Sequence, residues 1–501
     1  MKKYIILIVL ALAIAFNGCT DLEEVPYGFY TDENFYQNPE EAEIALLYAY
    51  SAFTFNEYHR GYFDLASLST DVMDNKPGEL QNGRTELDGW TVSSNTEAFR
   101  NFFKQSYIGI NRANAVIDNL EEIEFDPVEK DQILGEALFL KSWHNFILVR
   151  LFGEIPLRTK MVTEEIDVQT ELSSIEDIYA AIISDLELAE GKMTINRRHG
   201  RADKVAAQGL LSKVYLTLAS SKATGVPRYE WVSSADDMYA SAAEWAGKVI
   251  NDQSEYGFDM SGNIRNIFNP NMDDGPEHIF FEANDVSDPV QNPDMNDLFL
   301  AYAYYNPYNF LETDGTMTHN VTTGWEVYRT NPDFFATFDP QDKRAIELYT
   351  DKIYDDDTVE IASFTNWIIC KKYVDPSPDA ENWGRNGSKI LFMRYSDIAL
   401  VYAEAMGSSP EGYTQVNAIR NRSGLPDLTP GLSDEVFREA VFDERAWELN
   451  FEGHRLFELR RTRKVVEKLG DVDYAYFYPL PQSEIDLNPN ITGDEEKKGL
   501  R

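Results

Sequence analysis

The sequence predicts a mainly α-helical fold with few short strands and with long irregular connections between its helices. Two observations support this prediction. Several stretches carry apolar residues at the three- and four-residue spacing of a buried helix face. No stretch shows a periodic strand pattern of the kind that a catalytic barrel requires. The helices are therefore expected to form the core.

The first predicted helix begins at Pro39. Asn38 is a favoured N-cap residue, Pro39 fits the first helical position, and Glu40 and Glu41 place acids in the first turn. We expect this helix to continue to about Phe53.

Further helices are indicated by one capping signal and by apolar stripes. A capping-box pattern from Ser173 to Glu176 opens the second of these segments. The stripes, which we expect to be core, are Phe139, Trp143, Phe146, Ile147 and Leu151; Ile178, Ile182 and Leu186; Ala207, Leu211, Val214 and Leu218; and Ile398, Val401, Tyr402 and Ala405.

Small residues in one helix favour close packing of helix pairs. Ala206, Ala207 and Gly209 precede Tyr215, as in tetratricopeptide hairpins. No clean period of about 34 residues emerges, so the sequence predicts paired helices without defining repeats. Between the helices, the stretches 60–97, 254–335 and 351–388 are rich in Asn, Asp, Gly, Pro and aromatic residues. Long irregular loops of this kind are often functional.

The N-terminus reads as a secretory signal peptide over residues 1–18. Lys2 and Lys3 precede a mostly aliphatic run that is too short for a spanning helix, which needs about 20 residues. Gly18 before Cys19 favours lipoprotein processing, with acyl chains such as palmitate anchoring Cys19. Ordinary secretion, with Cys19 merely nearby, is the alternative.

Composition narrows the possible partners. The chain of 501 residues has a net charge of −40, so nucleic acid is excluded as a partner because phosphate binding needs a basic face. Cys370 is the only other cysteine, and a lipidated Cys19 would leave it without a disulfide partner. We expect Cys370 to be a buried apolar residue and not a reactive thiol.

Three unusual segments follow one another near the C-terminus. They are VNAIRNRSGLP at 416–426, DERAWELNFEGHRLFELRR at 443–461 and YPLPQSEIDLNPN at 478–490. In the middle segment, helical spacing groups Phe437, Val441 and Phe451 with charged residues, and buried charges must be paired. We therefore predict a structural ion-pair network, in preference to a catalytic cluster, formed by Glu444, Arg445, Glu448, Glu452 and Arg455.

Glycine and proline predict the backbone around this network. Gly453 is expected to end or kink the helix, and Pro479 and Pro481 force an extended path. The run 488–490 is typical of a turn.

The order, spacing and residue identities of these segments resemble the C-terminal region of the SusD/RagB family of nutrient-binding lipoproteins. Other segments resemble the family too, so the resemblance spans nearly the whole chain after the signal. They are NFY at 34–36, YIGINRAN at 107–114, EALFLKSWHNFILVRLFGEIPL at 136–157, GRADKVAAQGLLSKVYL at 200–216 and RYSDIALVYAEA at 394–405.

The resemblance implies one globular unit over residues 19–501, with an N-terminal part at about 20–230 and a C-terminal part at about 270–501. It implies four tetratricopeptide-like helix pairs and a loop-rich half that recognises the ligand. It also implies a lipid-anchored, surface-exposed protein of the outer membrane whose partner is a SusC-like TonB-dependent transporter. No cofactor is implied.

Candidate ligand-binding residues come from the irregular stretches. Trp90 stands where glycan-binding relatives supply a stacking aromatic side chain, and sugar rings suit a flat aromatic surface with polar groups at its rim. Asp71, Arg84 and Asn95 fit the polar role. Arg385, beside Trp383, is a second basic residue next to an aromatic one.

Tyr302, Tyr305 and Trp325 belong to the densest aromatic region outside the helices. These side chains can contact a glycan, or they can cover an apolar edge while their polar atoms stay in water, and the sequence leaves both open.

The leading function from the sequence is capture of an oligosaccharide and its delivery to the transporter, without catalysis. Peptide capture is the main alternative. No catalytic motif is present, although the 85 acidic residues leave a glycoside hydrolase possible. We predict no metal site, because the acidic run 355–357 is typical of a solvated surface and 269–275 fails the calcium-loop template. The C-terminal segments are expected to form framework only.

Overall fold

The computed structural model describes residues 35–164, 169–196, 198–251, 253–260, 262–272, 275–284, 295–301, 308–317, 324–355, 360–361, 368–375, 387–491 and 495–500. Within these ranges the chain is mainly helical with few short strands, as predicted. The signal peptide, Cys19, Tyr302, Tyr305 and Arg385 lie outside the described residues.

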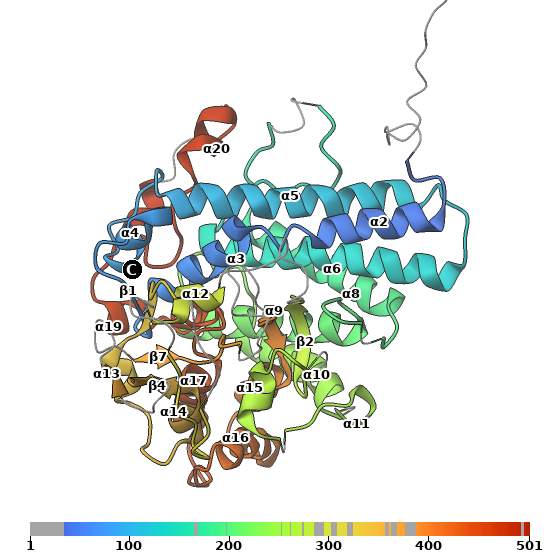
Figure 1. Cartoon of the computed structure of the whole chain (residues 1–501). Coiled ribbons are helices and arrows are strands. Elements are labelled where there is room, and N and C mark those ends of the chain that lie inside the picture. The colour runs from blue at the N-terminus through green and yellow to red at the C-terminus, as the bar shows by residue number, and fades with distance from the viewer. Residues whose placement is uncertain are drawn as a thin grey trace, which may run out of the picture.

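The longer helices form the scaffold. They are α2 (Pro39–Tyr50), α5 (Glu97–Leu120), α6 (Pro127–Phe152), α8 (Ile175–Lys192), α9 (Lys204–Thr224), α10 (Ala235–Asn251), α15 (Tyr395–Met406), α16 (Pro410–Arg422) and α17 (Asp434–Leu449). In chain order, α5 packs on α6, α6 on α8, α8 on α9 and α9 on α10, and α15 then packs on α10, α16 and α17. Figure 1 shows α2, α5 and α6 side by side along one edge.

The two predicted helix starts are confirmed with one shift. The side chain of Asn38 accepts a hydrogen bond from the Glu41 N–H at 3.0 Å, and α2 ends at Tyr50, before the expected Phe53. The N-cap of α8 is Ser174 and not Ser173, with its Oγ accepting from the Asp177 N–H at 3.1 Å. Because both serines lie just before acidic residues, the sequence alone does not distinguish which of them is the N-cap.

Shorter helices and strands make up the rest. The helices are α3 (Asn56–Phe63), α4 (Arg84–Asp88), α11 (Gln253–Tyr256), α12 (Met295–Phe299), α13 (Pro332–Phe335), α14 (Lys343–Leu348), α18 (Arg455–Arg461), α19 (Val465–Leu469) and α20 (Gln482–Leu487), with a π-helical turn at Asp64–Leu68 and 3-10 turns at Gln81–Gly83, Ile264–Phe268 and Glu495–Gly499. The strands pair antiparallel: β1 (Met73–Asn75) with β3 (Tyr328–Thr330), β2 (His278–Glu282) with β8 (Ile390–Arg394), β4 (Tyr349–Thr350) with β7 (Ile369–Cys370), and β5 (Ile353–Tyr354) with β6 (Glu360–Ile361).

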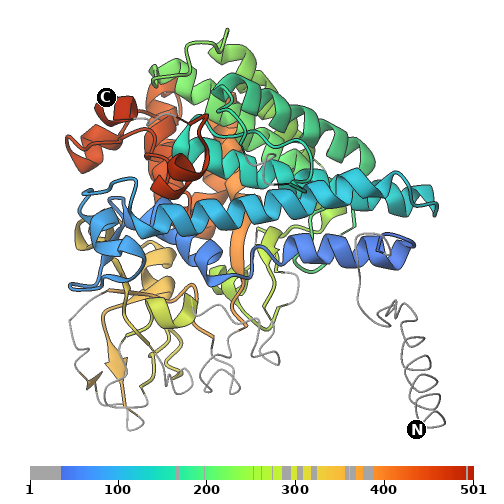
Figure 2. The same cartoon turned by 90° about the horizontal axis from the view of Figure 1, so that it is seen from above.

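The elements divide between two sides of α5. Figure 2 shows the green helices of residues 170–260 on one side of α5 and the yellow and orange short elements on the other. The stretches 60–97 and 254–335, predicted as irregular, in fact contain several short helices and strands. The contrast between a helical half and a loop-rich half is confirmed.

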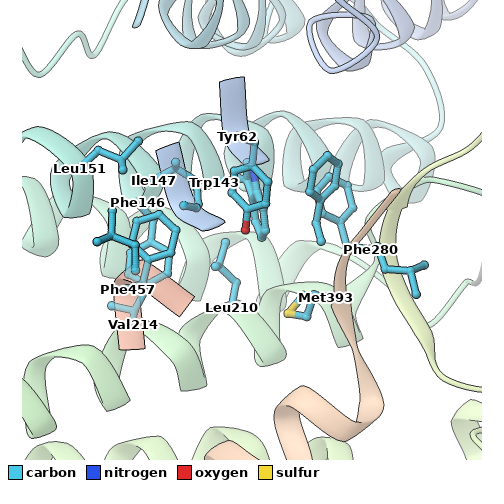
Figure 3. Packing of buried hydrophobic residues seen from close by; sticks show 14 of the residues in the cluster. Tyr62, Trp143, Phe146, Ile147, Leu151, Leu210, Val214, Phe280, Met393 and Phe457 are labelled. Carbon is cyan, nitrogen blue, oxygen red and sulfur yellow. The ribbon is translucent and has the colours of Figure 1, made fainter. Parts of the chain in front are cut away.

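Apolar side chains from both sides meet in one large core. The stripe from Phe139 to Leu151 on α6 is buried, and the ring of Trp143 lies 5.2 Å from that of Phe280 of β2 in the core shown in Figure 3. The indole N–H of Trp143 donates to the hydroxyl of Tyr58 at 3.1 Å. The core includes residues from Ala42 to Ile491, whereas the division into N- and C-terminal parts stays a prediction.

The small residues of α9 allow close packing, as expected. A Cβ on Gly209 would lie 2.9 Å from the Sδ of Met393 and 3.3 Å from the Cδ1 of Ile398, so this glycine lets both strand β8 and helix α15 approach α9. Among the described helices, none combines the length and the apolar character needed to cross a bilayer.

The predicted ion-pair network is present and buried. Arg394 of β8 donates to Glu448 (2.7 Å), Glu452 (2.7 Å) and Glu277 (2.9 Å). Burial raises the pKa of Glu448, but the charges of Arg422, Arg394 and Arg344 outweigh that effect and hold it well below the ordinary value. The network therefore joins α17 to β8 and to the turn that precedes β2.

A second cluster surrounds the other charged residues of the same segment. Arg445 donates to Asp397 at 2.7 Å and to Glu458 at 3.0 Å, and Arg461 also pairs with Glu458. Burial raises the pKa of Glu458, but the charges of Arg445 and Arg461 prevail and lower it to about 2. All five predicted network residues are thus ion-paired, Glu444 with Arg344 and Arg455 with Asp71.

The helix of this segment ends earlier than predicted. α17 ends at Leu449, so Phe451 lies beyond it with a positive φ of 62° and does not share its face. Gly453, with φ 76°, lies in the turn before α18, where a Cβ would collide with the Tyr62 ring. The turn is tight because the chain reverses against a buried aromatic side chain.

The remaining local predictions agree with the structure. Pro479 and Pro481 lie in a segment without helix or strand, where Pro481 has an extended φ/ψ of −58° and 138°, and the side chain of Asn488 accepts from the Asn490 N–H at 3.1 Å in a turn. Cys370 is buried, and burial raises the pKa of its thiol to about 12. It is therefore an unreactive residue, as expected.

Candidate ligand-binding site

A groove with a volume of about 660 Å³ opens where the loop-rich half meets the C-terminal helices. This volume lies within the range of about 300–1,000 Å³ that is usual for ligand pockets. Its walls are the segment Ser69–Asp71, the end of α4 with Trp90, the α13 region from Asn331 to Thr337, and residues of α17, α18 and α19.

The first wall follows an unusual helix end. α3 continues into the π-helical turn Asp64–Leu68, and the chain then leaves as Ser69–Asp71 toward β1. π-Helical turns are rare and frequent at functional sites. β1 pairs with β3, so the segment after β3 lies beside the same wall: the Asn331 amide donates to Asp74 at 2.9 Å.

Trp90 is held in a strained backbone conformation. Its φ is 49°, which is uncommon for a bulky side chain and points to a functional constraint. Its indole N–H donates to the Ser69 carbonyl at 3.0 Å, and its ring lies 5.8 Å from that of Tyr478. The side chain is half-buried and lines the groove. Because its N–H is already bonded, Trp90 can offer a ligand only ring surface.

Trp447 of α17 is a second half-buried tryptophan in the same groove. Its indole N–H donates to the Thr337 hydroxyl at 3.0 Å, and its ring lies 6.4 Å from that of Phe338. Helix α17 presents Glu444 and Glu448 to the buried network, so the neighbouring Trp447 faces another direction. The groove therefore has two aromatic surfaces, from segments more than 300 residues apart.

Asp71 and Arg455 form the polar floor between these segments. Arg455 donates from Nε to one carboxylate oxygen of Asp71 at 2.7 Å and from Nη2 to the other at 2.6 Å. This bidentate geometry fixes both side chains. The Nη1 of Arg455 is buried without a hydrogen-bond partner among the described residues.

Further acids make the groove negatively charged. Asp88, Asp333 and Asp443 also line it, and Lys468 is the one additional base among the described lining residues. Burial raises the pKa of Asp88 to about 6, with Asp74 adding to the rise and a hydrogen bond from the Asn75 N–H opposing it. Burial likewise raises the pKa of Asp443.

The structure places two of the predicted residues, Asp71 and Trp90, in this groove. Arg84 is only 1% exposed and donates from Nε to Asp64 at 2.9 Å, with its guanidinium 5.3 Å from the centre of the Tyr328 ring. It has no surface to offer a ligand, so its predicted binding role is replaced by a structural one. Its polar character was visible in the sequence, whereas its burial was not.

Asn95 and Trp325 lie apart from the groove lining. Asn95 is exposed just before α5. Trp325 precedes β3 whereas Asn331 follows it, so the two lie at opposite ends of that strand; Arg60 lies 5.6 Å from the Trp325 ring. Tyr302, Tyr305 and Arg385 lie outside the described residues, and their roles stay predictions.

Metal binding receives no structural support within the described ranges. They contain no group of three His, Cys, Asp or Glu side chains that could hold a metal ion. Parts of both acidic loops considered in the sequence, Asp356, Asp357 and 273–274, lie outside those ranges.

Sequence reasoning missed the contribution of the C-terminal signature to the groove. Trp447, Asp443 and Arg455 were assigned to the framework, yet they line it. Trp447 could have been identified from its position between Arg445 and Glu448. Both of these residues form buried ion pairs, so the side chain of Trp447 points away from that network.

Comparison with known proteins supports this picture at the level of the family. A model described as "SusD family" matches residues 301–475, and one described as "Starch-binding associating with outer membrane" matches residues 43–216. The SusD-like protein P2 of Formosa agariphila is 26% identical, over 98% of this chain and 99% of the relative.

Solved structures share the fold. A SusD superfamily protein from Parabacteroides distasonis superimposes with a TM-score of 0.77 at 21% identity, covering 91% of this chain and 98% of that one. A laminarin binding SusD-like protein gives a TM-score of 0.75 at 20% identity, covering 91% of this chain and 99% of that one. With both family models and a full-length relative in agreement, this chain belongs to the SusD/RagB family.

Proposed function

We propose that this protein captures an oligosaccharide in the groove between Trp90 and Trp447 and delivers it to a SusC-like TonB-dependent transporter, without catalysis. The observation that carries the proposal is the pair of half-buried tryptophans whose indole N–H groups are already bonded within the protein. Such side chains present apolar ring faces, which suit the C–H faces of sugar rings.

The polar groups of the groove complement these rings. Carboxylates accept hydrogen bonds from sugar hydroxyls, and four aspartates line the groove. Because four aspartates face only Arg455 and Lys468, the groove repels anions. A neutral saccharide therefore fits this site better than an acidic one.

The cellular setting follows from the sequence and the family. The signal peptide predicted over residues 1–18, the lipidation predicted at Cys19 and a family model described as associating with the outer membrane support an anchored, surface-exposed protein. A single unit over residues 19–501 would then stand above the transporter. The laminarin binding relative gives a first ligand to test, since laminarin is a neutral glucan.

One observation favours a hydrolase as the second candidate. A carboxyl with a pKa near 6, as at Asp88, suits a general acid, and several other carboxylates line the same groove. Asp71 is a poor partner for it, because both of its oxygens are held by Arg455.

The test is calorimetry of the protein against a panel of neutral oligosaccharides that includes laminarin fragments, together with a panel of peptides. Binding of a neutral oligosaccharide with no new reducing ends after long incubation is expected. Binding of peptides but of no glycan would assign the groove to peptide capture. New reducing ends that disappear in the Asp88→Asn variant would establish hydrolysis.

A further inference from the structure

A second pocket lies along α5, with a volume of about 550 Å³ and no lining residue in common with the first groove. It is lined by residues of α2, α5, α20 and the segment after α6. We propose that this pocket is a second saccharide site, selective for a sugar that carries a carboxylate or a sulfate. The choice of a saccharide rests on the proposed function; the preference for an anion rests on the pocket itself.

The charge of this pocket is opposite to that of the rest of the chain. In a protein of net charge −40, its lining carries three cations, Lys104, Arg112 and Arg158, against one acid, Glu484. Lys104, Ile108 and Arg112 are four residues apart on α5, so they share one face over about 12 Å. Elsewhere, buried arginines such as Arg344 and Arg394 are neutralised by carboxylates.

None of the three cations forms an ion pair with a carboxylate in the described part of the chain. Arg112 donates from Nη1 to the Tyr48 carbonyl at 3.1 Å and to the Ser51 hydroxyl at 2.9 Å, both uncharged. The Nε of Arg158 is buried without a hydrogen-bond partner. The three cations outnumber Glu484 in the described lining, and an excess of positive charge in a partly desolvated pocket is stabilised by a bound anion.

Aromatic and apolar groups beside the cations select the carrier of that anion. The Arg112 guanidinium lies 3.7 Å from the centre of the Tyr48 ring and so covers one face of this ring. Tyr48 is 58% exposed, so it provides an aromatic surface at the edge of the pocket. Arg158 lies 4.6 Å from the centre of the Tyr107 ring. Leu487, 68% exposed, completes an apolar wall. An inorganic ion would use the cations alone, whereas a charged sugar would use both sets of groups.

Among the described residues of the pocket lining, Glu484 of α20 is the one acid that faces these cations. Its presence opposite Arg158 favours a ligand that brings hydroxyl donors as well as an anionic group, since a hydroxyl can donate to this carboxylate. A sugar with one acidic substituent meets both requirements.

The test is calorimetry with three probes: a uronic-acid oligosaccharide, a sulfated oligosaccharide and a neutral laminarin fragment. We expect an acidic probe to bind, and the Lys104→Gln/Arg158→Gln variant to bind it at least tenfold more weakly. Lys343→Gln, which removes an exposed lysine of α14 outside both pockets, should leave binding unchanged. Added NaCl should weaken the acidic probe more than the neutral one.

The variants separate this inference from the proposed function. Trp90→Ala should weaken binding of the neutral probe and leave binding of the acidic probe unchanged. Loss of neutral binding alone would therefore bear on the first groove and not on the second site. Failure of every acidic probe to bind, or equal binding by the double variant, would overturn the second site. Unchanged acidic binding with loss of transporter capture by the double variant would assign the pocket to a protein interface and also overturn it.

Discussion

Replacing Glu448 with glutamine is expected to destabilise the fold strongly. Glu448 accepts from Arg394 at 2.7 Å and from Arg344 at 3.2 Å, and it also pairs with Arg422. Glutamine keeps the volume but removes the negative charge, so three buried guanidinium groups lose one shared counter-charge. Arg394 and Arg344 keep other carboxylate partners, which limits the loss without removing it.

Breaking a buried ion pair by removing one partner costs about 3–5 kcal/mol. The entropy of unfolding is about 2.1 cal/mol/K per residue, so a chain of 501 residues gains about 1 kcal/mol/K. The expected decrease in Tm is therefore about 3–5 °C. The matched control is Glu439→Gln, because Glu439 is 49% exposed and its pair with Lys464 at 2.7 Å is worth at most about 1 kcal/mol.

Differential scanning calorimetry of both variants at one scan rate and pH 7 measures this difference. A decrease of several degrees for Glu448→Gln with less than about 1 °C for Glu439→Gln is the expected result. Equal small shifts in the two variants would refute the reasoning that the buried network needs each of its carboxylates.

Three further predictions concern stability and thiols. The pKa of Glu458 in the folded protein, about 2, lies below its ordinary value of 4.5. Its contribution to stability is therefore complete above pH 4.5 and is lost as the pH falls toward 2, so the Tm should decrease in this range. A Tm that does not depend on pH between 4.5 and 2 would contradict this prediction. Gly453→Ala should lower the Tm more than Gly431→Ala, since both have positive φ but only Gly453 also faces a ring; equal shifts would exclude the collision. A thiol reagent should find no reactive group in the native protein and one, Cys370, after denaturation; two would show that Cys19 is not lipidated.

The fold was predictable wherever local signals were strong. Asn38 with Pro39 fixed the start of α2 because capping chemistry depends on neighbouring residues. The stripe on α6 identified the core because burial follows helical periodicity. The end of α17 was not predictable, since Leu449 gives way to a turn whose cause is Tyr62, far away in the sequence.

The site was predictable only in part, for the same reason. Trp90 was predicted from its loop and the resemblance to a family, and Asp71 from its polar side chain; both line the groove, and their contact with a ligand stays a prediction. Arg84 resembled them in sequence but is buried against Asp64, a contact that only the folded chain reveals. Trp447 was missed because the C-terminal segments were interpreted as framework only, and its exposure depends on how α17 packs.

The partners of the ion-pair network were equally hidden. Pairing of Glu448 could be inferred from the cost of burying a lone charge. Its partners Arg344, Arg394 and Arg422 come from three separate elements, and no local pattern connects them.

The central claim is that two tryptophans form the saccharide-binding surface. The most direct measurement is the affinity of a neutral oligosaccharide for the Trp447→Ala variant, with Trp447→Phe and Trp245→Ala as controls. Trp245 is a half-buried tryptophan of α10 that does not line the groove. We predict at least tenfold weaker binding for Trp447→Ala, equivalent to about 1.4 kcal/mol, partial recovery in Trp447→Phe and no change in Trp245→Ala. Unchanged affinity of a folded Trp447→Ala variant would contradict the account.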